Sequence, residues 1–356
     1  MPSEMTPLQL RGTTFPNRVW MSPMAQYAAG TDGMPTDWHV VHYGARAVGG
    51  AGLIVVESTA VGPSHRTTAA DLGIWTEEQA LAHRRLTSFI ADQGSVPGIQ
   101  LLAAGRKGSH QRPWVGEGQN SPVSVADGGW ELIAPSPIPF GDLTPPREAG
   151  LADLDEVVAA FAHAARMSDL AGYEVVEIHA SHGYLLHQFL SPLANRRTDE
   201  HGGSLQNRMR FPLRVARAVR EAFPAHKPVF VRITATDWVE GGITLEEAAT
   251  FAKELAAVGV DLLDVTSGVL VRDLQARPPA RNGVNVGFAS ALREASGLAV
   301  APVGQIVDLQ LAHDVIDAGT ADAVLVGRPL LRDPYLALRN RPSDPAAWPA
   351  QYHRAL

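Results

Sequence analysis

The sequence predicts an α/β protein that folds as a single (β/α)8 barrel, the TIM-barrel fold, with a lid-like insertion after the third strand. Eight short, nearly continuous apolar runs alternate with longer segments of helical periodicity along the 356 residues. Parallel strands that are covered on both faces have this composition, and eight βα units favour a closed barrel over an open sheet. No shift in composition divides the chain, so we expect residues 1–356 to form one domain.

The predicted strands follow one another at intervals that leave room for a helix between most of them. They are Arg18–Met21, Leu53–Ser58, Pro97–Leu102, Tyr173–Ile178, Val229–Ile233, Leu262–Val265, Ala299–Val303 and Ala323–Val326. The predicted helices are His39–Val48, Glu77–Asp92, Leu154–Leu170, Gln206–Ala222, Leu245–Val258, Gly287–Ala295 and Leu309–Ala318. Thr244 and Glu247 have the spacing of a capping box at the start of the fifth helix.

Two segments do not follow this alternation. Residues 105–150 are rich in Gly, Pro and Ser and contain Trp114, Trp130 and Phe140. A loop of this length inside a barrel is uncommon unless it is functional. We therefore interpret it as a lid over the mouth, with room for a small hairpin; a plain surface excursion is the alternative. Residues 342–356 begin Pro-rich and are interpreted as a C-terminal arm.

The bulk composition excludes several classes of function. The net charge is −7, the isoelectric point is near 6.0 and no basic run occurs, which argues against a nucleic-acid or anionic-membrane surface. The absence of cysteine excludes disulfides, thiolate catalysis and zinc–thiolate sites. The N-terminal stretch MPSEMTPLQL lacks the apolar core of a signal peptide, and no run has the length of a membrane span. We expect a cytoplasmic protein that acts on a small molecule.

Three side chains that can donate or accept protons follow the fourth predicted strand directly: His179, His182 and Tyr184. Titratable groups at a strand end are typical of active sites at the C-terminal mouth of a parallel barrel. The charged run 195–203 is interpreted as a solvated or ligand-facing loop, and Ser204 as the cap of the helix that follows.

Polar residues and glycines at other strand ends indicate a phosphorylated planar cofactor. Arg232 lies within the apolar fifth strand, where an unpaired charge would be very costly, and Gln100 places an amide in the third. Gly304 and Gly327 follow the seventh and eighth strands, and Arg328 stands next to a predicted helix start. This is the usual place of a phosphate site in such barrels.

With these motifs the chain resembles the Old Yellow Enzyme family of FMN-dependent ene-reductases, and within it the bacterial, thermostable-type branch. The most specific motif is HASHGYLLHQFLSPLANRRTDEHGGS at 179–204. The others are SPM followed by Tyr27, TDWHVVHYG at 36–44, GGAGLIVVESTAV at 49–61, QLLAAGRK at 100–107, VRITATDW at 231–238 and VGRPLLRDP at 326–334. The match extends over essentially the whole chain.

The resemblance implies an FMN-dependent NAD(P)H dehydrogenase that reduces activated C=C bonds of α,β-unsaturated carbonyl or nitro compounds. His179 and His182 would donate hydrogen bonds to the substrate oxygen, and Tyr184 would supply a proton after hydride transfer from flavin N5. Tyr27 would line the pocket, and NADPH or NADH would first reduce the flavin in ping-pong kinetics. Arg232 would stabilise the charge of the reduced flavin. The residues that would bind FMN are Ser22, Pro23, Met24, Ala25, Ala60, Gln100, Arg232, Gly304, Gly327 and Arg328.

The resemblance also implies an oligomer in which the chain end contributes to a neighbouring site. Arg354 occupies the position of an arginine that crosses a dimer interface in this branch. We expect a homodimer or homotetramer with Arg354 donated in trans to the partner's substrate site. A frayed chain end is the alternative.

Two positions depart from the family pattern. Ala25 stands where this branch usually has Cys, and Ala103 stands where it has His. Both changes remove a polar group near the mouth, and they bear on the flavin potential, the rate and the substrate. They therefore leave a second interpretation open. In it, the chain is an FMN enzyme of the same fold whose main reaction is NAD(P)H oxidation, demethylation or dehydrogenation.

Plainer interpretations remain open for single residues. Loop backbone could satisfy His179 and His182, Tyr184 could pack on Leu186, and Arg232 could pair with Glu177. Two other enzyme classes use the same residues. A Schiff-base aldolase would need Lys107, because Lys227 precedes the fifth strand and Lys253 lies within a helix. A metal-dependent hydrolase would use the two histidines as ligands but would leave the phosphate site unexplained, so we expect no metal.

Overall fold

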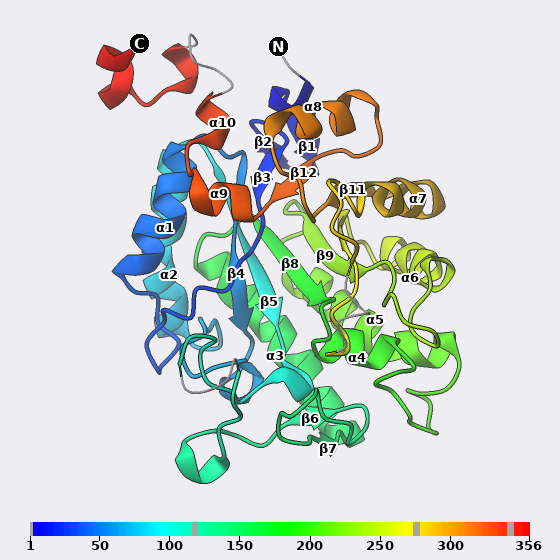
Figure 1. Ribbon diagram of the computed structural model, residues 1–356. Helices are drawn as coiled ribbons and strands as arrows, with labels where there is room; N and C mark the ends of the chain where they lie inside the picture. Colours follow the sequence, from blue (N-terminus) through cyan, green and yellow to red (C-terminus); the bar gives the residue numbers. More distant parts are fainter. Residues whose placement is uncertain (1–2, 116–119, 273–277, 340–344) are drawn as a thin grey trace.

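An eight-stranded parallel sheet rolled into a barrel forms the centre of the molecule; the computed structural model describes residues 3–115, 120–272, 278–339 and 345–356 (Figure 1). A parallel bridge between Val303 and Leu325 completes the ring. The strands are, in spatial order, β11 (Ala299–Pro302), β10 (Leu262–Thr266), β9 (Val229–Thr234), β8 (Val175–Ala180), β5 (Val96–Leu102), β4 (Leu53–Ala60), β3 (Val19–Met21) and β12 (Val324–Val326). The predicted barrel and all eight predicted strands are confirmed.

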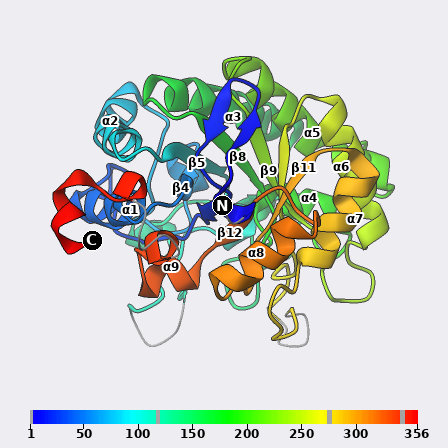
Figure 2. The same cartoon turned by 90° about the horizontal axis from the view of Figure 1, so that it is seen from above.

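Helices surround the barrel, and most of the apolar core lies between them and the strands (Figure 2). The helices are α1 (Asp37–Val48), α2 (Glu77–Asp92), α3 (Leu151–Leu170), α4 (Leu185–Leu190), α5 (Leu205–Ala222), α6 (Leu245–Ala257), α7 (Val286–Ser296), α8 (Leu309–Asp317), α9 (Arg328–Arg332) and α10 (Leu336–Arg339). Short 3-10 turns occur at Ser3–Met5, Pro63–His65, Gly105–Lys107, Val125–Asp127, Pro345–Ala347 and Ala350–Ala355. The seven predicted helices are all present, with ends that differ by a few residues.

Two predicted helix caps have different outcomes. Ser204 caps α5 as predicted, because its hydroxyl accepts a hydrogen bond from the backbone N–H of Asn207. Thr244 likewise accepts from the N–H of Glu247 at the start of α6. The Glu247 carboxylate, however, accepts from Arg208 Nη2 at 2.5 Å. The reciprocal half of the predicted capping box is therefore wrong: Glu247 instead partners a buried guanidinium.

A two-stranded antiparallel hairpin closes the N-terminal end of the barrel. It consists of β1 (Leu8–Leu10) and β2 (Thr13–Phe15), and it lies across the strands in Figure 2. Phe15 packs on Trp20 with ring centroids 4.7 Å apart, and Trp20 stacks on Phe230 at 5.8 Å. All three side chains are buried. This aromatic cluster fills the end of the barrel opposite the predicted mouth.

The insertion 105–150 carries a small sheet of its own. Strands β6 (Ile133–Ala134) and β7 (Arg147–Glu148) pair in parallel, so the predicted hairpin is wrong: two parallel strands require a crossover rather than a tight turn. Residues 116–119 of the predicted lid and 342–344 of the predicted arm lie outside the described residues.

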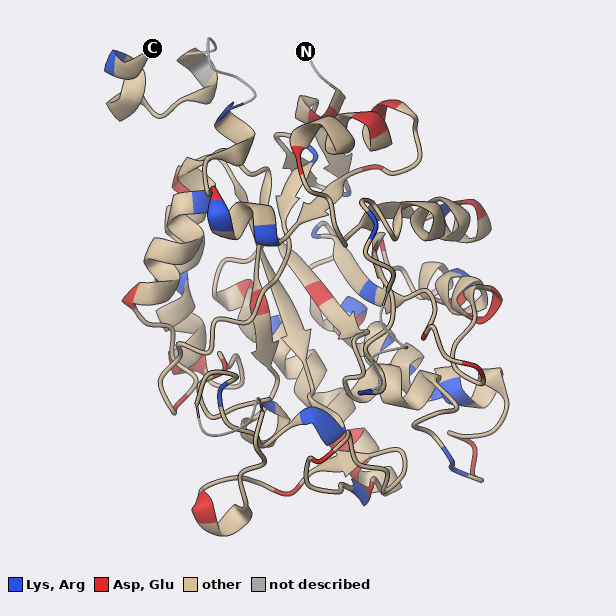
Figure 3. Ribbon diagram, viewed as in Figure 1, with Lys and Arg blue, Asp and Glu red and all other residues tan. Residues whose placement is uncertain are grey.

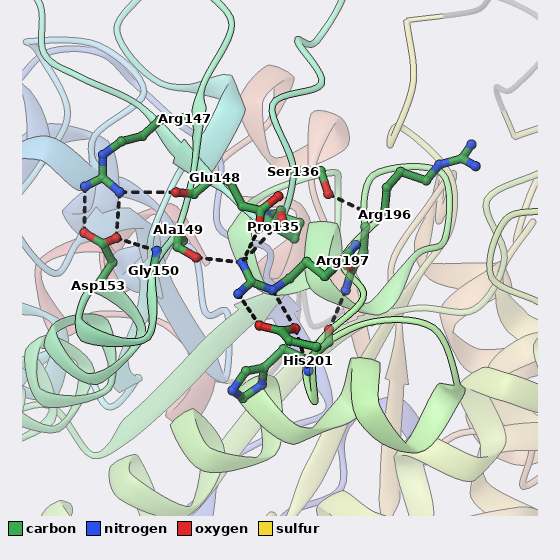
Figure 4. Close-up of polar contacts among 12 residues, drawn as sticks. Pro135, Ser136, Arg147, Glu148, Ala149, Gly150, Asp153, Arg196, Arg197 and His201 are labelled. Atoms are coloured by element: carbon green, nitrogen blue, oxygen red, sulfur yellow. Dashed lines mark hydrogen bonds and ion pairs between the residues drawn. The ribbon is translucent and has the colours of Figure 1, made fainter.

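The loop after α4 fixes the base of this insertion (Figure 4). Arg197 is buried, and its Nη1 donates to the carbonyl oxygen of Ala149 at 2.6 Å. Beside it, Arg147 makes two hydrogen bonds to Asp153 in the first turn of α3, at 2.6 and 2.7 Å. The interpretation of 195–203 as a purely solvated or ligand-facing loop is therefore wrong, because its buried arginine has a structural role.

Charged residues lie mainly on the helices and loops, and the strands carry few (Figure 3). Of the charged residues on strands, Glu177, Arg232 and Asp264 are buried inside the barrel, whereas Arg147 and Glu148 of β7 are exposed on the insertion. Among the helices within the described ranges, none is both long and apolar enough to cross a membrane. Charge inside the barrel is therefore confined to a small set of side chains near the functional end.

Phe15→Ala tests the aromatic closure. The substitution leaves a cavity beside Trp20, and we expect it to lower the free energy of unfolding by about 3–5 kcal/mol. Urea unfolding measures the loss. The matched control is Phe89→Ala on α2, where the ring is 39% exposed and the loss should be smaller. Equal losses for both variants would contradict a closing role for Phe15.

Candidate active site

Two adjoining cavities lie at the C-terminal mouth of the barrel. The larger, of about 700 Å³, is called the mouth cavity; its walls include Tyr27, Lys107, Phe140 and Tyr184. The smaller, of about 490 Å³, is called the arginine cavity; its walls include Arg232, Arg328 and Arg332. The residues that line both are His182, Thr266, Gly304, Gln305 and Arg328. These shared walls make the two cavities one continuous site of ligand-binding size.

The arginine cavity has the chemistry of a site for a phosphorylated planar group. Ser22, Pro23 and Met24, which follow β3, form one wall, and no acidic side chain is among the lining residues within the described ranges. Guanidinium groups bind phosphate through several N–H donors at once. Gly304 has φ +123°, and a Cβ there would lie 2.7 Å from the Asn285 amide, so this position in the cavity wall requires glycine. The residues present therefore fit the predicted cofactor.

The loop between Ser22 and Tyr27 is held from outside the cavities. Glu57 within β4 accepts hydrogen bonds from the backbone N–H of Gln26 at 2.5 Å and from the Tyr43 hydroxyl at 3.0 Å. Tyr27 itself has φ +52°, a conformation that is uncommon for a side chain of this size. A buried carboxylate thus fixes the loop that carries both the Ser22 end and the Tyr27 end of the site.

His179, His182 and Tyr184 meet at the end of β8, as predicted. The ring of His179 lies 5.3 Å from that of His182 and 4.8 Å from that of Tyr184, both in edge-on arrangements. The backbone N–H of Ser181 donates to His179 Nδ1, which leaves the proton of the neutral ring on Nε2. His182 has φ +54°, and its Nε2 lies 3.0 Å from the Thr266 hydroxyl. Two of the three, His182 and Tyr184, line the mouth cavity.

A second histidine fixes the turn that carries these groups. The backbone N–H of Gly183 donates to His187 Nδ1 at 2.8 Å, and His187 Nε2 lies 3.0 Å from Asp237. Both His187 and Asp237 are fully buried. The turn between His182 and Tyr184 is therefore held by a buried pair that lies outside both cavities.

Burial keeps the titratable groups of the site in their uncharged forms. Burial, the neighbouring His182 and the Arg232 charge lower the pKa of His179 well below its usual value, and burial, followed by the Arg232 charge, lowers that of His182 similarly. Burial raises the pKa of Tyr184, with smaller contributions from Tyr27 and Asp71. At neutral pH the two rings are neutral and the Tyr184 phenol keeps its proton. The pocket can therefore donate hydrogen bonds and one proton without first being charged.

Lys107 and Thr266 are functional candidates whose roles sequence reasoning did not assign. Lys107 Nζ donates to the carbonyl oxygens of His182 and Val269 and lies 5.1 Å from the Tyr184 ring centroid. Burial and the charge of Arg106 lower its pKa to about 7. Lys107 is therefore bound to backbone carbonyls at the mouth of the barrel. A polar residue at the end of β10 was the available signal for Thr266.

Inside the barrel, Gln100 and Arg232 are bonded to the protein itself. Gln100 accepts from the Ser58 hydroxyl at 2.5 Å and donates to Glu177 at 2.6 Å. Arg232 donates through Nε to Asp264 at 2.5 Å and through Nη2 to the Ser22 hydroxyl at 2.9 Å. The main partner of Arg232 is thus Asp264, whereas Glu177, at 3.7 Å, is secondary. Arg232 nevertheless also lines the arginine cavity.

The remaining predicted site residues divide into two groups. Ser22, Pro23, Met24, Gly304, Gly327 and Arg328 line the arginine cavity with Arg232, and Tyr27 lines the mouth cavity. Four others line neither cavity: Ala25 is exposed, Ala60 and Gln100 are buried in β4 and β5, and Arg354 is exposed near the chain end. In Figure 1 residues 345–356 lie outside the barrel, beyond α10.

Comparison with known proteins gives consistent results. A family profile described as the NADH:flavin oxidoreductase / NADH oxidase family matches residues 5–343. The chain is 42% identical to an NADPH dehydrogenase of Geobacillus sp. (strain WCH70) over 332 residues, which cover 93% of this chain and 91% of that protein. It is 40% identical to an NADPH dehydrogenase of Bacillus subtilis (strain 168), with 93% and 92% covered.

Solved structures agree with these sequence matches. Morphinone reductase has a TM-score of 0.80 at 29% identity, with 97% of this chain and 92% of that chain covered. The Old Yellow Enzyme homologue of Zymomonas mobilis has a TM-score of 0.81 at 25% identity, with 97% and 94% covered. The similarity therefore extends over nearly the whole barrel.

The neutral histidines predict a dependence of stability on pH. Because the folded-state pKa values of His179 and His182 lie below 6.5, the unfolded chain binds protons that the folded chain does not. Their contribution to stability is present above pH 6.5 and is lost as the pH falls, by about 1.4 kcal/mol per pH unit for each ring. Urea unfolding measures the free energy of unfolding at each pH. In His182→Gln this free energy should depend less steeply on pH, because one of the two rings no longer contributes. The exposed control His353→Gln should not, and equal slopes in the wild type and both variants would refute the assignment.

Proposed function

The chain belongs to the NADH:flavin oxidoreductase / NADH oxidase family, and on this premise we propose that it reduces activated C=C bonds of α,β-unsaturated carbonyl or nitro compounds. It is an FMN-dependent oxidoreductase that takes electrons from a nicotinamide cofactor. The observation that carries the proposal is the clustering of His179, His182 and Tyr184 beside a cavity lined by arginines. The similarity to morphinone reductase and to an Old Yellow Enzyme homologue supports it.

We infer that the arginine cavity holds the cofactor. Its lining residues Ser22, Pro23, Met24, Gly304, Gly327, Arg328 and Arg232 are the proposed contacts. Ala25, Ala60 and Gln100, which line neither cavity, stay proposed contacts through the family resemblance alone. When bound, FMN supplies the hydride that is added to the β-carbon of the substrate. Arg328 and Arg332 suit the phosphate because their charge is not cancelled by any acidic lining residue within the described ranges.

The neutral histidines would hold the substrate oxygen. His179 carries its proton on Nε2, because Nδ1 accepts from the Ser181 N–H. The Thr266 hydroxyl contacts Nε2 of His182 and so limits rotation of that ring. Hydrogen bonds to a carbonyl or nitro oxygen polarise the conjugated C=C bond and stabilise the negative charge that develops on the oxygen.

Tyr184 would supply the proton that completes the reduction. Its raised pKa keeps the phenol protonated, and Lys107 Nζ lies 5.1 Å from its ring centroid and 4.3 Å from that of Phe140. In its protonated form, Lys107 places a positive charge beside the ring and favours transient phenolate character during proton transfer to the α-carbon. Solvent then restores the proton to the Tyr184 hydroxyl.

An oxidase-type main reaction is the second candidate. Ala25 is exposed and has no side-chain donor, so the polar group that this branch usually places there is missing. Its loss changes the environment of the flavin edge without changing the fold. Reoxidation of the reduced enzyme by cyclohexenone compared with air distinguishes alkene reduction from NAD(P)H oxidation.

Two segments complete the proposal. The insertion 105–150 would act as a lid, since His110, Asn120, Phe140 and Leu143 from it line the mouth cavity. The arm 342–356 would reach a second copy in a homodimer or homotetramer and donate Arg354 to the substrate site there. Arg354 is exposed and lines neither cavity of its own chain, and the Tyr352 hydroxyl lies 3.4 Å from that of Tyr335.

Tyr184→Phe tests the proton donor. Flavin reduction by NADPH should stay nearly unchanged, whereas cyclohexenone reduction should slow by about 10²–10⁴-fold, because only that half-reaction needs the phenolic proton. Anaerobic stopped-flow absorbance measures the two half-reactions separately. Tyr27→Phe, also in the mouth cavity, is the matched control and should have a much smaller effect. Equal slowing of both half-reactions in Tyr184→Phe would remove this residue from the proposed role.

Deletion of residues 352–356 tests the arm. The truncated protein should keep FMN, because the arginine cavity is intact, but the Michaelis constant for cyclohexenone should change several-fold. Arg354→Ala should reproduce this change, and His353→Ala should not. Light scattering gives the oligomeric state of each variant. A fully active monomer at micromolar concentration would end the proposal.

A further inference from the structure

Two carboxyl groups and one guanidinium lie together inside the barrel, just below the arginine cavity. Glu177 of β8, Arg232 of β9 and Asp264 of β10 come from three neighbouring strands, and Arg232 pairs in register with Asp264. The side chains of Glu177 and Asp264 have no solvent exposure, and that of Arg232 is 4% exposed. With both acids ionised, the cluster would carry one negative charge in excess at a site that is shielded from solvent.

The hydrogen bonds of the two acids leave one oxygen of each without a donor. Glu177 Oε1 accepts from the Gln100 amide at 2.6 Å, and Asp264 Oδ2 accepts from Arg232 Nε at 2.5 Å. Among the described residues, no N–H or O–H group reaches Glu177 Oε2 or Asp264 Oδ1. The two carboxyl groups approach the same guanidinium nitrogen, because Arg232 Nε lies 2.5 Å from Asp264 Oδ2 and 3.7 Å from Glu177 Oε1. A single proton held by this pair of acids would supply the missing donor and would balance the charge.

We propose that Glu177 and Asp264 hold one shared proton, and that this proton sets the charge which Arg232 presents to the flavin. Glu177 is in this proposal a positioning residue, because it acts through Arg232 and does not line either cavity. The inference rests on the proposed binding of FMN against Arg232, although the proton itself can be detected independently of any substrate.

The surroundings of Glu177 favour the neutral acid. Burial and then the charge of Asp264 raise its pKa to about 8, and Arg232 and the Gln100 hydrogen bond oppose this increase. The groups that face it are Asp264 from β10, Arg232 from β9 and the uncharged Gln100 from β5. Asp264 receives the direct hydrogen bond from the guanidinium and is therefore the ionised member of the pair.

The shared proton matters because Arg232 has two tasks. Its Nη2 donates to the Ser22 hydroxyl at the wall of the arginine cavity, while both Nε and Nη2 contact the Asp264 carboxylate. One ionised carboxylate neutralises the guanidinium. Two would place net negative charge next to the flavin, which gains electrons when it is reduced. Above about pH 8, reduction of the cofactor by NADPH should therefore be accompanied by uptake of one solvent proton onto Glu177.

Infrared spectroscopy of the holoprotein detects the proton directly. A buried protonated carboxyl gives a C=O stretching band that a carboxylate does not have. Glu177→Gln keeps the acceptor for Gln100 and offers an amide N–H to Asp264, and the acid band should disappear. Asp264→Asn should abolish the same band although Glu177 is still present, because Glu177 then becomes the only counter-ion of Arg232. The control is Glu247→Gln, which removes the ion pair with Arg208 in the outer layer of helices and should keep the band.

The flavin midpoint potential gives the functional readout. From about pH 8 upward, the wild-type potential should fall more steeply than that of Glu177→Gln. The additional slope corresponds to a tenfold change in the reduction equilibrium per pH unit, or about 30 mV for a two-electron couple. A merely structural role for Glu177 would shift the potential without changing this slope.

Two results would overturn the proposal. One is an acid band that survives in Asp264→Asn, which would mean that Glu177 is protonated independently of its neighbour. The other is the same slope of potential against pH in the wild type and in Glu177→Gln. Neither result depends on alkene reduction, so a failure of the proposed substrate class would leave the test intact. If Glu177→Gln does not fold, the band in Asp264→Asn still decides the question.

Discussion

The burial of Arg232 at the centre of the barrel is the constraint on which the rest of the site depends. A guanidinium without a partner at this depth would cost far more than the fold could sustain. Asp264 supplies the partner, and it does so only in the observed register of β9 with β10. A slip of one residue would turn either side chain to the helical face of the barrel. The ion pair thus fixes the register of the strands, and Nη2, which also contacts Asp264, donates to the Ser22 hydroxyl at the cavity wall.

Supporting residues outside the cavities give the site its precision. His187 and Asp237 hold the backbone between His182 and Tyr184, and Glu57 holds the loop between Ser22 and Tyr27. None of these three buried side chains lines either cavity. His182 and Tyr27 both have positive φ, which is unfavourable unless the surroundings enforce it. The functional groups are therefore strained locally and held in place by hydrogen bonds from the layer behind them.

The sequence predicted those features that depend on local pattern. Apolar runs located the eight strands, and the residues that follow β8 were correctly expected to meet, because parallel strands end at one rim. Contacts that join distant segments could not be predicted in this way. The bond between His182 and Thr266 spans 84 residues, and the buried role of Arg197 depends on the insertion that it anchors. The parallel pairing of β6 with β7 likewise has no local signal, since each strand has only two residues.

Charge is distributed unevenly between the whole chain, the inside of the barrel and its mouth. The chain carries a net charge of −7, which by itself would repel a phosphorylated cofactor and an anionic nicotinamide reductant. Inside the barrel one guanidinium is matched by Asp264, and a neutral Glu177 keeps the balance from becoming negative. At the mouth Arg328 and Arg332 have no acidic neighbour among the described lining residues, so the field there is positive. Because low-dielectric walls concentrate such a field, a local excess of two guanidinium groups outweighs the distant and screened surface acids. An acidic protein can in this way attract anions to one site, provided that the charges behind that site cancel.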